Sequence, residues 1–182
     1  AIKFLDIGGG LGIQYKDEEE GDPKILMAGV KNRLEGKEYK IILEPGRSII
    51  GSAGILVTRI EYIKNAGGKK FAIIDAGMND LIRPSLYDAW HEVKELENRE
   101  ILSDTYDLAG PVCETGDILA KDRNLKILPN DFVAFMDVGA YGSVMSSNYN
   151  SRLKPMELLV TGGEIEVIRR KETFEDLIAL ES

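Results

Sequence analysis

The chain has 182 residues and a formal net charge of −8, from 23 lysines and arginines against 31 aspartates and glutamates. Its 43% hydrophobic content can supply a buried core, and its acidic balance argues against nucleic acid or an anionic membrane as the main partner. The single cysteine excludes an intrachain disulfide, and no apolar run approaches the roughly 20 residues of a membrane-spanning helix. We therefore expect a mixed α/β protein of the cytoplasm.

The first part of the chain has the pattern of a parallel sheet. Residues 2–7 are apolar strand formers that run into Gly8-Gly9-Gly10, and residues 39–43 form a second apolar run. Between them, an acidic run at 17–22 followed by Pro23 predicts that a helix opens there, with acidic residues complementing its dipole. The order predicts a βαβ piece. Because a buried strand this early needs neighbours on both sides, we expect the C-terminal part of a longer protein.

From about residue 52 the pattern changes to short, β-branched segments separated by turn residues. We expect residues 1–50 to be an α/β domain and residues 51–182 to be a mainly antiparallel β domain with a short C-terminal helix. The expected strands are 54–65, 70–74, 91–97, 105–109, 132–138, 156–160 and 164–168, and the expected helix is 174–180.

The glycine run after the first strand is a candidate phosphate loop. Glycines allow backbone N–H groups to approach a phosphate closely, so Gly8, Gly9 and Gly10 could line one, although a plain tight turn explains them equally well. The run is not a dinucleotide fingerprint, because Ile13 stands where the third glycine would be needed, and no Gly-Lys-Ser/Thr follows as in a Walker A loop.

Two pairs of polar residues are candidates for ligand binding. Glu44 and Arg47 follow the second strand, where parallel sheets place their chemistry, although a solvated surface turn would look the same. Arg83 and Tyr87 are four residues apart in a turn-like stretch. An arginine can hold a carboxylate with two hydrogen bonds and a phenol can add a third, but an ordinary loop is an equal alternative.

Three further residues carry possible chemistry. The lone Cys113 lies between proline and glycine turn residues, and acids at +1 and +4 favour a protonated thiol that donates a proton over a thiolate nucleophile. The alternative is a small buried apolar residue. Tyr141 lies among small residues after a strand, so it either reaches a ligand or packs at a hairpin corner. His91 is the only histidine, which excludes a multi-histidine metal site, and we read it as structural.

The order and spacing of these segments resemble the diaminopimelate decarboxylases, a family of pyridoxal-phosphate (PLP) enzymes in the alanine-racemase and ornithine-decarboxylase superfamily. The segments that carry the resemblance are Gly8-Gly9-Gly10, Glu44-Pro45-Gly46-Arg47, Arg83-Pro84-Ser85-Leu86-Tyr87, Cys113-Glu114-Thr115-Gly116-Asp117, Gly139-Ala140-Tyr141-Gly142 and Ser147 to Arg152. The resemblance implies the remnant of a PLP-binding (β/α)₈ barrel followed by an antiparallel β domain. The barrel half with the Schiff-base lysine would lie upstream.

The resemblance also implies roles for the cofactor-binding residues. The glycines at 8–10 would hold the PLP phosphate, and Glu44 would face the pyridine nitrogen and keep it protonated. Arg47 would contact the phosphate or a substrate carboxylate. Tyr141 would touch the cofactor and the substrate end.

For the substrate, the resemblance implies that Arg83 and Tyr87 grip a carboxylate. It implies a homodimer with shared active sites, in which Cys113 donates a proton in the partner's site and Glu114 reads the distal amino group. The whole enzyme would convert meso-2,6-diaminopimelate to L-lysine and CO₂, and the present chain alone would be inactive. The alternatives are a carboxynorspermidine, arginine or ornithine decarboxylase, a non-catalytic regulatory homologue, and an independent β-domain binding module.

Overall fold

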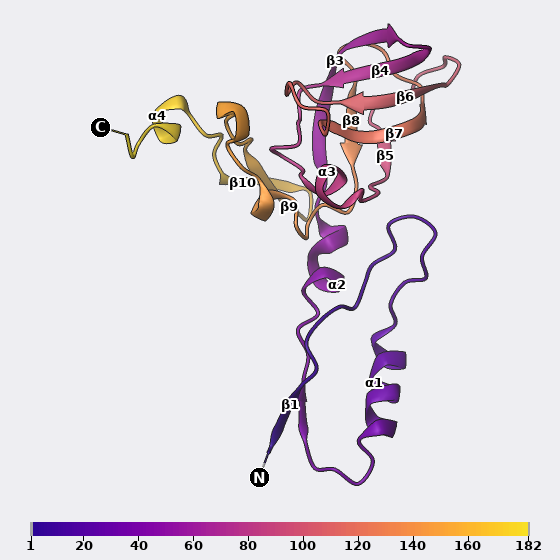
Figure 1. Ribbon diagram of the computed structural model, residues 1–182, viewed down its shortest axis with the longest axis vertical. Coiled ribbons are helices and arrows are strands. Elements are labelled where there is room, and N and C mark those ends of the chain that lie inside the picture. Colours follow the sequence, from indigo (N-terminus) through magenta and orange to yellow (C-terminus); the bar gives the residue numbers. More distant parts are fainter. Residues whose placement is uncertain (1, 182) are drawn as a thin grey trace.

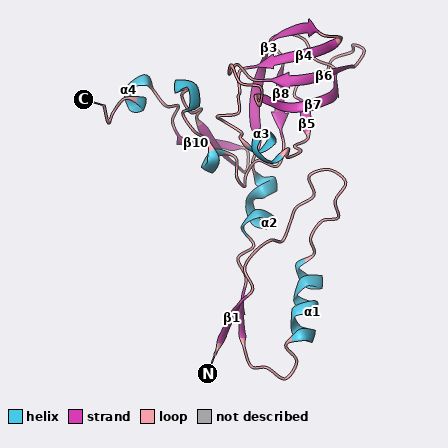
Figure 2. Ribbon diagram, in the orientation of Figure 1, coloured by secondary structure: helices cyan, strands magenta, loops and turns pink. Residues whose placement is uncertain are grey.

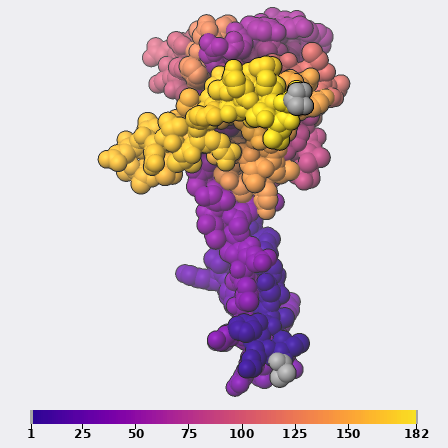
Figure 3. Space-filling model, turned by 90° about the vertical axis from the view of Figure 1, so that its left-hand side faces the viewer, coloured from indigo at the N-terminus to yellow at the C-terminus, as the bar shows by residue number. Residues whose placement is uncertain are grey.

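The computed structural model describes residues 2–181 and has an extended shape. An N-terminal arm, residues 2–50, projects from a six-stranded sheet domain, and a C-terminal hairpin leaves that domain sideways (Figure 1). The space-filling view in Figure 3 shows the arm as a narrow stalk. Among residues 2–181, no helix is both long enough and apolar enough to cross a membrane.

The arm contains the predicted βαβ order. Strands β1 (Phe4–Asp6) and β2 (Lys40–Ile42) pair in parallel, and helix α1 (Pro23–Arg33) connects them. The acidic run does not enter the helix as expected: only Asp22 acts on it, as an N-cap whose side chain accepts from the Lys24 N–H. Helix α1 has no buried residue and Ile25 is 73% exposed, so the helix contributes no side chain to a core within residues 2–181.

The sheet domain holds the core. Its strand order is β5-β8-β3-β4-β6-β7, and Figure 2 shows the strands curling around one another. Large apolar side chains from several strands meet inside, including Ile60, Ile74, Leu108, Leu119, Val133 and Phe135. The bounds are β3 Leu56–Ala66, β4 Lys69–Ile74, β5 Val93–Glu95, β6 Asp104–Ala109, β7 Ile118–Leu125 and β8 Phe132–Phe135.

The sheet differs from the sequence prediction in two respects. Strands β4 and β6 pair in parallel, because the long connection 75–103 carries the chain back to the starting edge, while the other pairings are antiparallel. Strand β7 was not predicted. Its middle is charged, Asp122 has a positive φ of 53°, and Arg123 points inward, so the usual alternation is hidden.

Short helices and a hairpin complete the fold. Helix α2 (Gly46–Ile50) joins the arm to the sheet domain, and α3 (Arg83–Tyr87) lies in the connection after β4. The predicted hairpin is present as β9 (Glu157–Thr161) and β10 (Glu164–Arg169). Helix α4 (Phe174–Leu177) begins with a capping box in which Thr173 and Asp176 satisfy each other's backbone N–H groups.

Candidate functional site

The glycine loop and Glu44 meet at one end of the parallel strand pair. The Glu44 N–H donates to the Gly8 carbonyl over 2.9 Å, and a Cβ on Gly9 would collide with the Glu44 carbonyl oxygen. Gly8 and Gly10 have φ values of 71° and 90°, which favour glycine. The Gly8 N–H is bound to Asp6, whereas the N–H groups of Gly9 and Gly10 have no partner among residues 2–181. These two N–H groups can therefore hold an anion.

Arg47 connects the arm to the sheet domain through aromatic rings. It lies on α2, directly after Glu44-Pro45-Gly46, and its guanidinium carbon is 5.3 Å from the centre of the Tyr141 ring. The Tyr15 ring lies 5.9 Å from the same atom. Both distances are within cation–π range, so Arg47 has its orientation limited by two rings from distant parts of the chain.

Tyr141 is placed by a glycine contact at the base of the sheet domain. The Gly139 N–H donates to the Gly51 carbonyl and the Val138 N–H to the Gly54 carbonyl, both over 2.9 Å. A Cβ on Gly139 would lie 2.9 Å from the Gly54 nitrogen and would collide with the Ile50 carbonyl, so only glycine fits. Tyr141 itself has a φ of 61°, which costs about 1–3 kcal/mol in a non-glycine residue. Tyr141 thus follows directly after this close contact between the two segments.

Arg83 is a buried cation that contacts His91 and Tyr15. It opens α3, is 7% exposed, and its Nη1 donates to His91 Nε2 over 2.9 Å. The Tyr15 ring centre lies 4.8 Å from its guanidinium carbon. No carboxylate within residues 2–181 lies within 4.0 Å of it. Tyr87, on the same helix, is 63% exposed, so the two predicted partners lie in different environments.

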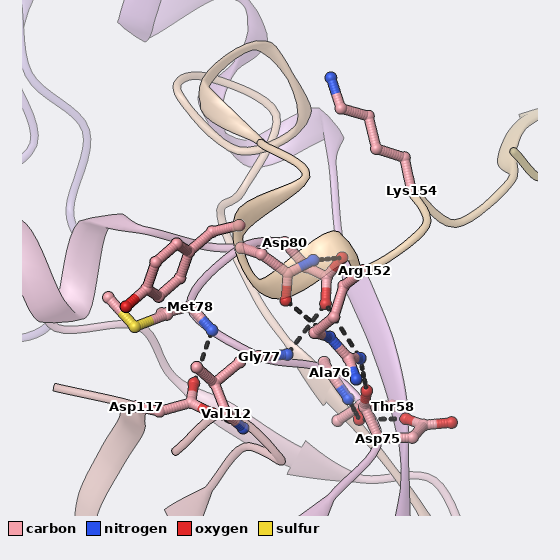
Figure 4. Close-up of polar contacts among 12 residues, drawn as sticks. Thr58, Asp75, Ala76, Gly77, Met78, Asp80, Val112, Asp117, Arg152 and Lys154 are labelled. Atoms are coloured by element: carbon pink, nitrogen blue, oxygen red, sulfur yellow. Dashed lines mark hydrogen bonds and ion pairs between the residues drawn. The ribbon is translucent and has the colours of Figure 1, made fainter. Parts of the chain in front are cut away.

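Cys113 and Glu114 lie on the exposed part of the loop between β6 and β7. Asp117 anchors this loop, because its carboxylate accepts from the N–H groups of Met78 and Val112, each over 2.6 Å (Figure 4). Burial raises the pKa of Asp117, and these two hydrogen bonds counteract part of the rise. Glu114 accepts a hydrogen bond of 3.1 Å from the Tyr149 hydroxyl, which raises the pKa of that phenol.

A second anchor ties the same region to the 147–152 segment. The Arg152 Nε donates to the Asn79 side chain over 2.8 Å, and its Nη2 donates to the Asp75 carbonyl over 2.6 Å (Figure 4). Asp80, 3.9 Å from Arg152, caps the turn by accepting from the Gly77 N–H, and burial raises the pKa of Asp80. Three connections of the sheet domain are thereby fixed to one another.

The structure thus gathers the predicted residues into three groups. The first is the strand-end group of Gly8, Gly9, Gly10 and Glu44. The second is the arginine group of Arg47, Arg83 and Tyr141, with Tyr15 and His91. The third is the loop group of Cys113 and Glu114. No hydrogen bond or ion pair within residues 2–181 joins the loop group to the arginine group.

Sequence reasoning missed Tyr15, which contacts both arginines. Nothing in its neighbourhood distinguishes it from an ordinary loop tyrosine, since its importance comes from two residues that are distant in sequence. A groove of about 720 Å³ also lies on the sheet domain, beside Asp75, Asp80 and Arg152, and none of the predicted site residues lines it.

Comparison with known proteins places these features in one family. Residues 15–139 match the pattern of the pyridoxal-dependent decarboxylase C-terminal sheet domain. A diaminopimelate decarboxylase of Pseudomonas aeruginosa is 49% identical over 181 residues, which is 100% of this chain and 44% of that protein. The chain therefore spans less than half the length of the curated relatives it matches.

Solved structures agree with the sequence matches. A diaminopimelate decarboxylase of Helicobacter pylori complexed with L-lysine has a TM-score of 0.92 at 45% identity, covering 98% of this chain and 44% of that one. The enzyme of M. jannaschii has a TM-score of 0.94 at 37% identity, covering 100% and 43%. A viral arginine decarboxylase, 20% identical with a TM-score of 0.70, shares the fold. The chain belongs to the pyridoxal-dependent decarboxylases, of which it carries the C-terminal sheet domain.

Proposed function

We propose that the whole protein decarboxylates meso-2,6-diaminopimelate to L-lysine and CO₂ with PLP. The observation that carries the proposal is the buried Arg83, a cation without a carboxylate partner among the described residues. Burying an unpaired charge is costly unless a ligand of opposite charge completes the site. The relatives named as diaminopimelate decarboxylases, one of them with L-lysine bound, point to the same substrate.

The strand-end group fits PLP. The N–H groups of Gly9 and Gly10 lack partners, and a side chain at position 9 would collide with the Glu44 carbonyl, so the loop provides a cradle for the phosphate. Glu44 lies beside this loop, where its carboxylate would keep the pyridine nitrogen protonated. Bound PLP supplies an acceptor for the electron pair that remains when the carbon–CO₂ bond breaks. Arg47, which follows Glu44 by three residues at the start of α2, would take the phosphate or a substrate carboxylate.

The arginine and loop groups suit a substrate with two amino-acid ends. Arg83 offers guanidinium N–H groups to the carboxylate of the end that does not react, and exposed Tyr87 adds its phenol when the rest of the protein or a partner closes over it. Glu114 suits the distal ammonium group. Ornithine has no second carboxylate, so it would leave Arg83 unsatisfied.

Cys113 and Glu114 belong, in this proposal, to the site of a partner subunit. Cys113 is exposed, and no hydrogen bond or ion pair within residues 2–181 ties it to the arginine group of its own chain. A protonated thiol held at the partner's reacting carbon would return a proton to it after CO₂ has left. We propose a homodimer with shared active sites in the cytoplasm, in which the arm, residues 2–50, is part of a (β/α)₈ barrel completed by the upstream chain.

Substrate turnover by the whole protein tests this function. Purified protein with PLP is given meso-diaminopimelate, ornithine and arginine, and the release of CO₂ is measured. A site in which a substrate carboxylate must pair with a buried arginine strongly rejects substrates that lack the second carboxylate. We therefore expect kcat/KM for meso-diaminopimelate to exceed that for ornithine or arginine by at least about 10²-fold. Equal turnover of ornithine or arginine would contradict the substrate assignment.

A further inference from the structure

His91 forms two hydrogen bonds that fix its protonation. The imidazole is fully buried, at 0% exposure, and each ring nitrogen has one partner. Nε2 lies 2.9 Å from Arg83 Nη1, and Nδ1 lies 2.8 Å from the carbonyl oxygen of Met136. A guanidinium can only donate and a carbonyl can only accept. The ring must therefore accept at Nε2 and donate from Nδ1, which only one neutral tautomer does.

The surroundings of His91 oppose its protonation. Burial lowers the pKa of His91, and the positive charges of Arg83 on α3 and Arg123 on β7 lower it further. The Met136 carbonyl and Asp137, which follow β8, act in the opposite direction without reversing the result. On the remaining side, the neutral Tyr15 ring meets the imidazole edge to face, with centres 5.5 Å apart. The imidazole therefore stays uncharged beside the Arg83 guanidinium.

The backbone of His91 is held as firmly as its ring. The Nη2 of Arg123 donates to the His91 carbonyl over 3.1 Å, while the Arg123 guanidinium packs against Trp90. Burial lowers the pKa of Arg123 to about 10. Arg123 is 7% exposed, and its Nε and Nη1 have no hydrogen-bond partner within residues 2–181. Its described hydrogen bonding is thus directed at the His91 main chain.

A neutral hydrogen-bond partner orients an arginine without neutralising its positive charge. A buried carboxylate in place of His91 would also fix the guanidinium, but it would neutralise it and compete with a substrate carboxylate. We propose that His91 is the positioning residue of the substrate site, a neutral imidazole that holds Arg83 ready for the carboxylate of the substrate's distal end. This inference rests on the proposed function, in which Arg83 binds that carboxylate.

Two substitutions in the whole enzyme separate positioning from folding. The amide of asparagine reaches the place of Nδ1, so His91→Asn keeps a donor to Met136 and loses the acceptor for Arg83. The amide of glutamine reaches the place of Nε2, so His91→Gln keeps that acceptor and loses the other bond. Losing one hydrogen bond to a charged group weakens binding by roughly ten- to a hundredfold. We expect His91→Asn to raise the KM for meso-diaminopimelate by that factor, with kcat changed less than about threefold.

The expected result for His91→Gln is a KM within about threefold of the wild-type value. Asp131→Asn, which removes a buried charge at the opposite end of β8, serves as the control for general destabilisation and should leave KM unchanged. Equal KM values for wild type and His91→Asn, or a His91→Gln variant as impaired as His91→Asn, would overturn the inference. If the wild type does not turn over diaminopimelate, the proposed function fails instead.

The tautomer of His91 gives a test that does not depend on activity. Nitrogen-15 chemical shifts of the whole protein, with His91 assigned by its loss in a substituted variant, report which ring nitrogen carries the proton. We expect a protonated Nδ1 and an unprotonated Nε2 at neutral pH. A proton on Nε2, or on both nitrogens, would contradict the positioning role.

Discussion

Replacing Asp117 with alanine is expected to release the loop that carries Cys113 and Glu114. Asp117 is 2% exposed, and its carboxylate accepts two hydrogen bonds of 2.6 Å, one from Val112 within the loop and one from Met78 outside it. The backbone of Gly110 presses directly against this carboxylate and leaves no room for a side chain there. Asp117 therefore connects Met78 of the β4–α3 connection to Val112 of the catalytic loop proposed above.

The size of the effect follows from the two hydrogen bonds. A hydrogen bond to a charged group contributes about 1.5–3 kcal/mol, and the cost of burying the carboxylate offsets part of the sum. We expect Asp117→Ala to lower the free energy of loop opening by about 2–4 kcal/mol. Asp117→Asn keeps one acceptor but turns an N–H group toward the second donor, so about half of that loss is expected. Asp104→Asn, at a partly exposed ion pair with Lys70 that lies outside both segments, is the control and should change their exchange little.

Amide hydrogen exchange measures this opening locally, without requiring the whole protein to unfold in two states. Exchange of peptides covering residues 76–80 and 110–117 in the whole protein should accelerate about 30-fold or more in Asp117→Ala, since about 1.4 kcal/mol corresponds to a factor of ten. The turnover number should fall in parallel, because Cys113 is no longer held in place. Unchanged exchange at these two segments would refute the account of Asp117 as the loop anchor.

Two further predictions concern the arginine group and acid stability. Tyr15→Phe should leave the KM for diaminopimelate nearly unchanged, because the Tyr15 hydroxyl has no hydrogen-bond partner within residues 2–181. Tyr15→Leu removes two cation–π contacts of about 0.5–2 kcal/mol each and should raise this KM severalfold. Equal KM values for the two variants would contradict a role of the aromatic ring. Arg99 holds the pKa of buried Asp131 below its ordinary value of 3.8, so this pair stabilises the fold above that value and loses its effect as pH falls through the lower folded-state pKa. As the pH falls from about 4 to about 2, the urea midpoint of wild type should therefore fall more than that of Asp131→Asn. Parallel pH profiles would contradict this.

The sequence predicted most of the elements because their patterns are local. The parallel β1–β2 pair, the β3–β4 hairpin with its glycine turn and the β9–β10 hairpin follow from apolar runs and turn residues. The sequence analysis did not predict strand β7, because Arg123 faces inward there and stacks on Trp90, whereas a charged residue in a sequence normally indicates an exposed position. Helix α3 has five residues and begins with Arg83-Pro84, so it is too short to show a helical period.

For the candidate site, sequence order supplied the residues but not their surroundings. The motifs named Arg47, Arg83 and Tyr141, and the structure brings Arg47 to Tyr141 through the glycine contact at Gly139. Tyr15 and the two-sided bonding of His91 depend on residues from four separate segments, so no local pattern could reveal them. The anchoring role of Asp117 is likewise a property of a buried carboxylate facing two main-chain N–H groups.

The position of the cofactor tests the central claim most directly. A crystal structure of the whole protein with PLP and L-lysine would show the contacts of the phosphate and of the pyridine nitrogen. The account predicts the phosphate within hydrogen-bond distance of the Gly9 and Gly10 N–H groups and the Glu44 carboxylate at the ring nitrogen. A phosphate held away from this loop, with Glu44 turned from the ring, would contradict it.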